Sequence, residues 1–159
     1  MQKITTFLTF KEKGEEAVNF YVSLFKNSKI MSITRSEMEG PIPKGALQHA
    51  SFQLDGQEFM AMDGGPYFSF AQGFSLFVNC ETQEEIDRLW EKLSEGGEEQ
   101  MCGWVKDRYG VSWQIIPSIL GELMTDKDAE KSKRVMDAFL KMKKFDIQGL
   151  RRAYEGKSS

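Results

Sequence analysis

"WVKDRYGVSWQIIP", from Trp104 to Pro117, is a stretch that predicts two β-strands joined by a tight turn. Aromatic and β-branched residues are enriched in strands, and the glycine between the two runs accepts the positive φ that tight turns require. The second predicted strand carries a single amide, Gln114, among apolar neighbours. Two questions follow: whether this hairpin occurs once in the chain, and whether Gln114 binds a metal or a substrate.

The same pattern occurs earlier in the chain. "ALQHASFQL" (46–54) and "EFMAM" (58–62) flank Asp-Gly-Gln, and Asp-Gly between two apolar runs indicates a hairpin. Aligning the chain with itself without a gap places Gly56 on Gly110 and Met60 on Gln114. The amide therefore has a counterpart in the first half of the chain.

Each hairpin is also preceded by a matching strand and helix. The predicted pairs are "ITTFLTF" (4–10) with "GEEAVNFYVSLF" (14–25), and "FSLFVNC" (74–80) with "TQEEIDRLWEKL" (82–93). A second ungapped alignment places Thr6 on Ser75 and Ala17 on Ile86. The same order of elements in both halves predicts an internal duplication of one β-α-β-hairpin unit.

The composition of this 159-residue chain is that of one globular domain, with 40% hydrophobic and 28% charged residues. No apolar run reaches the roughly 20 residues that cross a bilayer, and the N-terminus lacks the apolar core of a signal peptide. We expect a cytoplasmic protein without a membrane partner. Only two cysteines are present, Cys80 and Cys102, which predicts free thiols in a reducing compartment.

The net charge of −3 gives no basic surface for a phosphate backbone, so a nucleic-acid partner is not expected. The lysines and arginines of residues 127–145 alternate with acids and apolar residues along a predicted helix. Short helices are predicted before and after it, over "ILGELM" and over residues 146–156. The apolar stripe of the helix predicted over residues 127–145 includes Val135 and Phe139. We expect it to pack on the sheet or on a partner subunit.

With this duplication, the chain resembles the vicinal oxygen chelate (glyoxalase/bleomycin resistance/dioxygenase) superfamily, specifically its PhnB-like branch labelled 3-demethylubiquinone-9 3-methyltransferase. The stretches that carry the resemblance are "ITTFLTF…GEEAVNFYVSLF", "HASFQLDGQEFMAMDGGP", "FVNCETQEEIDRLWEKLSEGGE" and "CGWVKDRYGVSWQIIPSILGELM". The resemblance implies an α+β fold: two tandem βαβββ modules whose curled mixed sheets surround a shared cavity, in a homodimer. Residues 28–34 would supply the strand after the first helix.

The expected domain organisation follows from this resemblance. Residues 1–117 would form the glyoxalase-like domain, with module one at about 1–66 and module two at about 72–117. Residues 118–159 would form a C-terminal helical extension, packed on the same domain or on a partner subunit.

The resemblance also implies four positions at which metal-using relatives hold a divalent ion: Thr6, Met60, Ser75 and Gln114. Such ions need several imidazole, carboxylate or carbonyl ligands, at about 2.0–2.2 Å. Two alcohols, a thioether and one amide supply only one such ligand, and the single histidine, His49, lies at the start of a predicted strand. We therefore expect no metal and no other cofactor, with a divalent metal as the alternative.

The methyltransferase label has little support in these residues. Gly96-Gly97 follows a helix and precedes Glu98-Glu99, which would repel a nucleotide-like methyl donor. No Gly-x-Ser-x-Gly elbow is present, whereas a Cys–His pair of His49 with Cys80 or Cys102 stays open. Whether the protein is an enzyme is therefore left undecided by the sequence.

Strand alternation predicts that Thr6, Met60, Ser75 and Gln114 share one face with Leu8, Met62, Phe77 and Ile116. The expected lining of a cavity between the modules is Thr6, His49, Met60, Ser75, Trp104 and Gln114. A mainly apolar cavity with a few polar groups is typical of a small-molecule site, and a filled core is the alternative.

Three functions remain open at this point. The leading hypothesis is metal-free binding or transformation of a small organic molecule. The alternatives are a metal-dependent lyase or dioxygenase of the same superfamily, and a non-catalytic sequestration protein of the resistance type.

Overall fold

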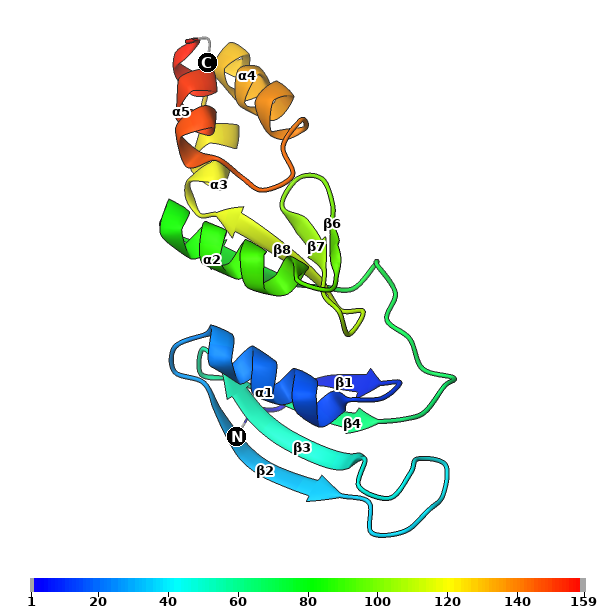
Figure 1. The fold of residues 1–159 in the computed structure, drawn as a ribbon. Helices are drawn as coiled ribbons and strands as arrows, with labels where there is room; N and C mark the ends of the chain where they lie inside the picture. Colours follow the sequence, from blue (N-terminus) through cyan, green and yellow to red (C-terminus); the bar gives the residue numbers. More distant parts are fainter. Residues whose placement is uncertain (1, 158–159) are drawn as a thin grey trace. The chain divides into compact units, whose positions relative to one another are not determined.

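Two compact units, Met1–Phe70 and Ala71–Ser159, make up the chain in the computed structural model, which describes residues 2–157. Each unit holds one four-stranded mixed sheet and one long helix beside it, as Figure 1 shows. The predicted α+β fold with two βαβββ modules is confirmed. Within residues 2–157, none of the helices is long and apolar enough to span a bilayer.

The first unit consists of β1 (Thr6–Phe10), α1 (Gly14–Leu24), β2 (Lys29–Arg35), β3 (Leu47–Leu54) and β4 (Gln57–Asp63). Its strands lie in the order β1-β4-β3-β2, with β1 parallel to β4 and the other pairs antiparallel. The turn between β3 and β4 has φ of 49° at Asp55 and 79° at Gly56, the two positive values of a type I′ hairpin. The Asp-Gly signal therefore predicted this turn correctly.

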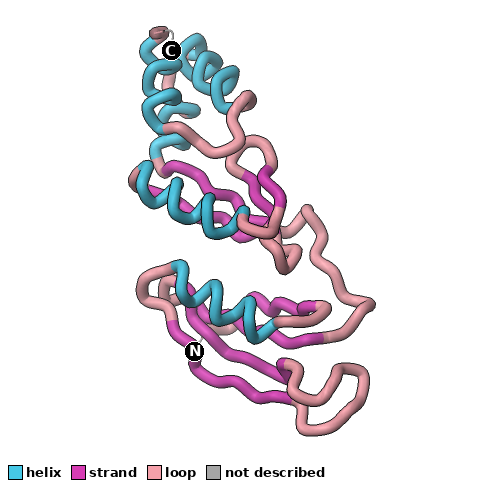
Figure 2. The backbone as a smooth tube through the Cα atoms, viewed as in Figure 1, coloured by secondary structure: helices cyan, strands magenta, loops and turns pink. Residues whose placement is uncertain are grey.

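The second unit repeats that topology with β5 (Ser75–Cys80), α2 (Gln83–Ser94), β6 (Glu98–Glu99), β7 (Trp104–Lys106) and β8 (Ser112–Pro117). Its order, β5-β8-β7-β6, is that of the first sheet, and β5 runs parallel to β8. Three further helices follow: α3 (Ile119–Met124), α4 (Ala129–Phe139) and α5 (Ile147–Glu155). Figure 2 shows this run of helices after the last strand.

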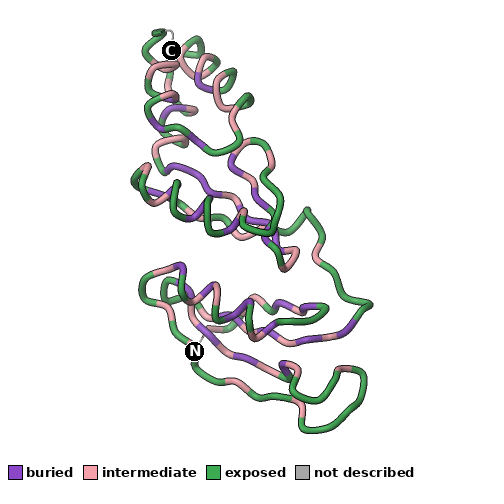
Figure 3. Tube along the Cα trace, viewed as in Figure 1, coloured by how far each residue is buried: buried purple, intermediate pink, exposed green. Residues whose placement is uncertain are grey.

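Each sheet buries one face under its own helix, because apolar residues alternate along the strands. Leu8 and Ala61 of the first sheet are buried with Tyr21 of α1, and Ile115 of the second sheet is buried with Leu89 of α2. Figure 3 shows this alternation as purple segments along the strands and the inner sides of α1 and α2. We call the opposite side of each sheet its open face.

The strand register corrects one prediction from the sequence. Phe7 pairs with Met60 and Phe77 pairs with Gln114, so Phe7 rather than Leu8 is the counterpart of Phe77. Thr6 pairs with Phe59, which is buried on the helix side, and the prediction that Thr6 shares a face with Met60 is wrong.

The cause of this error is a connection of different length in the two modules. The helices keep the alignment proposed from the sequence, since Ala17 and Ile86 are both fully buried. Matching strand residues of the two modules are one position further apart in the chain than matching helix residues. The link from strand to helix is therefore one residue shorter in the second module. A slip of one residue moves every side chain of a strand to the other face.

The long helix predicted through Phe145 ends earlier, at Phe139. Beyond it the chain turns, and the carbonyls of Met142 and Lys143 accept hydrogen bonds from the backbone N–H groups of Cys102 and Gly103, both at 2.8 Å. These bonds to the second module replace the helical bonds that the apolar periodicity alone would favour.

Candidate functional site

The six predicted cavity residues divide between the two units. Thr6, His49 and Met60 belong to the first unit, and Ser75, Trp104 and Gln114 belong to the second. The shared cavity between the modules stays a prediction, and each group is described within its own unit.

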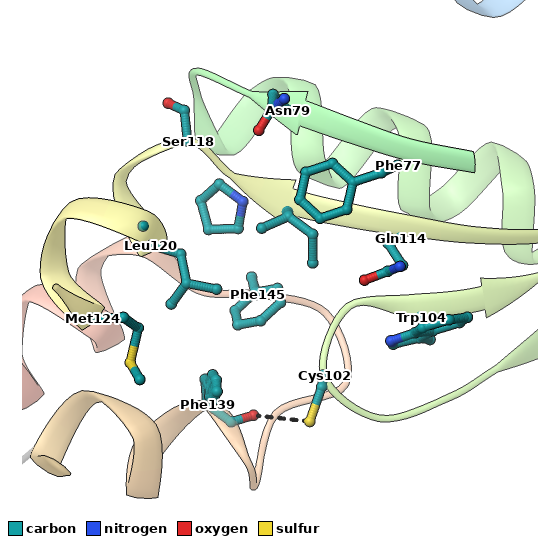
Figure 4. A pocket seen from close by; sticks show the side chains of 13 residues that line it. Phe77, Asn79, Cys102, Trp104, Gln114, Ser118, Leu120, Met124, Phe139 and Phe145 are labelled. Atoms are coloured by element: carbon teal, nitrogen blue, oxygen red, sulfur yellow. Dashed lines mark hydrogen bonds between the residues drawn. The ribbon is translucent and has the colours of Figure 1, made fainter. Parts of the chain in front are cut away.

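A pocket of about 450 Å³ lies in the second unit, between the open face of its sheet and the C-terminal extension (Figure 4). Trp104 and Gln114, two of the predicted residues, are part of its lining. The sheet and the link after it contribute Phe77, Asn79, Cys102, Trp104, Gln114, Ile116, Pro117 and Ser118; the extension contributes Leu120, Gly121, Met124, Phe139 and Phe145. The volume is within the range of small-molecule sites, about 300–1,000 Å³.

Three neighbouring strands bring the key residues of the sheet wall together. Gln114 on β8 lies in register with Phe77 on β5 and with Trp104 on β7. Paired residues point to the same face of a sheet, so an indole, an amide and a phenyl ring stand side by side. The cross-strand register, rather than sequence proximity, assembles this wall.

The amide of Gln114 is held in one orientation by Ser75. Its Nε2 donates a hydrogen bond to the Ser75 hydroxyl at 2.9 Å. Figure 4 shows its oxygen end turned toward the cavity. Ser75 thus positions the Gln114 amide, and the amide oxygen is a hydrogen-bond acceptor available to the pocket.

The wall formed by the extension is anchored through Phe145 and Gly103. Phe145 is only 1% exposed, and a side chain at Gly103 would approach its ring to 2.5 Å and the Ile115 carbonyl oxygen to 2.8 Å. Gly103 also has φ of +80°, which favours glycine. The hairpin therefore requires glycine at this position for both conformation and space.

Helix α2 provides the second anchor of the extension. The Gln83 side chain donates to the Phe145 carbonyl at 2.9 Å and accepts from the Ile147 N–H at 2.8 Å. Lys144 forms an ion pair with Asp87 at 2.9 Å. The hydrogen bond from Gln83 and, as the second cause, the hydrogen bond from Lys144 hold the pKa of the Asp87 carboxyl below its usual value.

The two cysteines occupy different environments. Burial raises the pKa of Cys80 to about 12, so its thiol stays protonated at neutral pH and is a poor nucleophile. Cys102 lines the pocket, is partly exposed, and donates through sulfur to the Phe139 carbonyl at 3.7 Å. Its pairing with His49, which lies in the first unit, stays a prediction.

In the first unit, Met60 and His49 lie on the open face together with Phe7. The imidazole centroid of His49 lies 6.0 Å from that of the Phe7 ring, and Phe7 pairs directly with Met60. A second hollow, of about 310 Å³, lies in this unit and has Asp63 in its lining. Both oxygens of Asp63 accept backbone N–H groups, from Gly14 at 2.8 Å and Leu47 at 2.9 Å, which gives this carboxylate a structural role.

Several lining residues were not predicted from the sequence. Leu120, Met124 and Phe139 lie in helices and Phe145 lies in the link after α4; the sequence predicted only that this extension packs on the sheet or on a partner subunit. Phe7, which is on the open face of the first sheet and not in this lining, was missed because of the register error. Phe139 did belong to the apolar stripe identified in the sequence. A stripe shows that a helix buries one side, but not which surface receives it.

The four positions implied for a metal do not fit a divalent cation. Thr6 faces the helix side of its sheet, Met60 offers a thioether, and the Ser75 hydroxyl is already engaged with the Gln114 amide. Among residues 2–157, no three His, Cys, Asp or Glu side chains gather as a metal-binding group. The donor set is too weak for a first-row divalent ion, and we derive no reaction step through one.

A family model described as 3-demethylubiquinone-9 3-methyltransferase matches residues 2–116. The chain belongs to this PhnB-like family. A solved structure of a putative 3-demethylubiquinone-9 3-methyltransferase, PhnB protein, from Bacillus cereus is 48% identical, with a TM-score of 0.69 over 73% of this chain and 99% of that one. Protein PA1353 from Pseudomonas aeruginosa is 26% identical, with a TM-score of 0.62 over 74% and 98%.

The fold extends to more distant proteins of the vicinal oxygen chelate superfamily. The fosfomycin resistance protein FosX from Listeria monocytogenes is 14% identical, with a TM-score of 0.56 over 76% of this chain and 94% of that one. Another FosX structure, 15% identical with a TM-score of 0.52 over 71% and 90%, is a complex with Mn(II) and sulfate. At these identities the likeness concerns the fold alone. Among curated proteins, none matches the chain.

Proposed function

We propose that this PhnB-like protein binds a small organic molecule in the pocket of its second module, without a divalent metal. The observation that carries the proposal is the Gln114 amide, which Ser75 orients so that its oxygen faces a largely apolar pocket of about 450 Å³. One oriented polar group among apolar walls is the usual composition of a ligand site. Such a group fixes the direction in which a ligand lies.

The metal-free part of the proposal rests on donor chemistry. The FosX complex contains Mn(II). In this chain, the four positions that the superfamily resemblance implies for a metal hold two hydroxyls, a thioether and an amide. Neutral ligands of this kind bind first-row divalent ions weakly compared with imidazole or carboxylate. Lyase or dioxygenase chemistry that depends on such an ion is therefore not carried over to this protein.

The test combines elemental analysis with ligand screening. Protein purified without chelator is expected to contain far less than one metal ion per chain, and some neutral organic compounds should raise its melting temperature. Gln114→Leu should abolish that shift, because the leucine cannot accept a hydrogen bond. Gln53→Leu, at a partly exposed position of β3 in the first module, is the matched control and should leave the shift intact.

Two outcomes would contradict the proposal. One is near-stoichiometric zinc, nickel, iron or manganese that survives dialysis and disappears in Gln114→Leu. The other is ligand binding that is the same in Gln114→Leu and in the unaltered chain. Following the bound compound over time then distinguishes an enzyme, which converts it, from a sequestering protein, which releases it unchanged.

A further inference from the structure

We infer that the C-terminal extension makes the pocket of the second module selective for an uncharged aromatic molecule that carries a hydrogen-bond donor. This inference rests on the proposed function and names the class of ligand for the same site. It depends on the origin of the extension wall, on the charge of the lining, and on the arrangement of aromatic rings.

The extension wall is a feature that the family match does not include. The family model ends at residue 116, and the Bacillus cereus chain is 99% covered by a match to 73% of this chain. Leu120, Met124, Phe139 and Phe145 therefore add a second side to a sheet face that the family shares. Specificity that comes from this wall therefore arises outside the part of the chain that the family model matches.

Within residues 2–157, the side chains that line the pocket include no Asp, Glu, Lys, Arg or His. Two charged groups next to lining residues have partners: Glu81 accepts from the Ser118 hydroxyl at 3.2 Å, and Lys144 pairs with Asp87 at 2.9 Å. An ion that enters such a pocket loses hydration and gains no opposite charge. The lining therefore disfavours both anions and cations.

Aromatic rings stand on both sides of the pocket. Phe77 and Trp104 come from the sheet and Phe139 comes from the extension. Phe145, only 1% exposed, supports Phe139 from behind, with centroids 6.0 Å apart and ring planes at 51°. Rings arranged in this way favour a planar guest by stacking and edge contacts. The Gln114 oxygen turned toward the cavity accepts a hydrogen bond, so a phenol, an aromatic amine or an aromatic amide satisfies it.

A matched pair of fluorescent probes tests the charge selectivity. N-Phenylnaphthylamine and anilinonaphthalene sulfonate share the same rings and the same bridging N–H, and differ in one sulfonate. The unaltered protein should bind the neutral probe at least about tenfold more tightly, a difference of roughly 1.4 kcal/mol. The dissociation constants come from fluorescence titration at fixed salt.

Substitution in the extension tests whether its wall determines that preference. Met124→Lys places a positive charge in the lining, and should lower the preference for the neutral probe at least about fivefold by improving binding of the sulfonate. Met136→Lys is the matched control, because Met136 is 38% exposed on α4 and outside the lining. It should leave both dissociation constants unchanged.

The outcomes separate this inference from the proposed function. Equal affinities for the two probes, tighter binding of the sulfonate by the unaltered chain, or no binding of either probe would overturn the inference. So would equal effects of Met124→Lys and Met136→Lys. If a charged or aliphatic compound binds, and its binding is lost in Gln114→Leu, the inferred class of ligand is overturned while the proposed function is supported.

Discussion

The two modules share one topology and differ in what lies over their open faces. The first module has long strands, β2 and β3, of seven and eight residues, and leaves Phe7 and Met31 each 46% exposed. The second has short strands, β6 and β7, of two and three residues, and its sheet is joined by the extension. The duplication thus preserved the framework and left the ring at this position exposed in both modules, since Phe77, the counterpart of Phe7, is 54% exposed. The extension that follows the last strand of the second module is the part that differs.

Each module also buries one carboxylate, but uses it differently. Asp63 connects the start of α1 to the start of β3 through the N–H groups of Gly14 and Leu47. Asp107 accepts from the N–H groups of Tyr109 and Val111 within its own turn, and from the Trp113 indole at 2.8 Å. The first stabilises a connection between elements and the second stabilises a hairpin.

The largest expected effect comes from removing the ring that anchors the extension. Phe145→Ala should lower the free energy of unfolding of the second module by about 3–5 kcal/mol, because a buried phenyl ring leaves a cavity. Chemical denaturation followed by tryptophan fluorescence measures it, since all three tryptophans lie in this module.

The control for that substitution is Leu140→Ala. Leu140 is 53% exposed directly after α4, and its loss should change stability by less than about 0.5 kcal/mol. Similar losses for the two variants would show that the extension is not anchored through Phe145.

The next effect concerns two glycines with positive φ, one in each module. Gly103→Ala should cost about 2–4 kcal/mol, because the new methyl group meets both Phe145 and the Ile115 carbonyl in addition to the backbone strain. Gly45 has a φ of +91°, but no atom would lie within 4 Å of an added Cβ. Gly45→Ala should therefore cost only the backbone strain, about 1–2 kcal/mol. Equal costs measured by denaturation would contradict the close packing at Gly103.

A smaller effect is expected in cysteine reactivity. Iodoacetamide at pH 8 should label Cys102 in the native protein and leave Cys80 unmodified, because burial raises the pKa of Cys80 to about 12. Peptide mapping by mass spectrometry identifies the labelled residue, and unfolded protein, in which both react, is the control. Labelling of Cys80 at the same rate as Cys102 in the native state would contradict its burial.

The smallest effect concerns one surface carboxylate on each module's helix. The Glu15 carboxylate accepts a hydrogen bond from Arg35 at 2.8 Å, which lowers its pKa below the usual 4.5. The pKa of the Asp87 carboxyl is lowered below the usual 3.8, first by the hydrogen bond from Gln83 and then by Lys144. A depressed folded-state pKa adds stability above the unfolded-state value, and this is lost as the pH falls through the folded-state value. Both contributions should therefore be present at neutral pH and disappear below about pH 4.

Carboxyl NMR titration checks the assignment of these two shifts. Arg35→Gln should raise the pKa of Glu15 alone, and Lys144→Gln should raise that of Asp87 alone. A change at both sites in either variant would show that the two ion pairs are not independent.

The fold could be predicted from local patterns because these patterns act over short distances. Asp55-Gly56 determines its own hairpin through backbone conformation, and Thr82 accepts the Glu85 N–H at 3.2 Å as the N-cap of α2. The error at Thr6 arose because the link between strand and helix differs in length between the two modules. A self-alignment without gaps cannot represent that difference. Gln114 was identified as the single amide of its predicted strand, but its bond to Ser75 required the paired strands.

The sequence by itself determined the repeated order of strands and helices and the turn positions, since hydrophobic period and glycine conformation are properties of neighbouring residues. Only the tertiary structure decided that Phe145 packs against Gly103, and that Phe139 faces Gln114 across a pocket. These contacts join residues far apart in the chain. Their energy comes from shape complementarity and buried area, which no local pattern encodes.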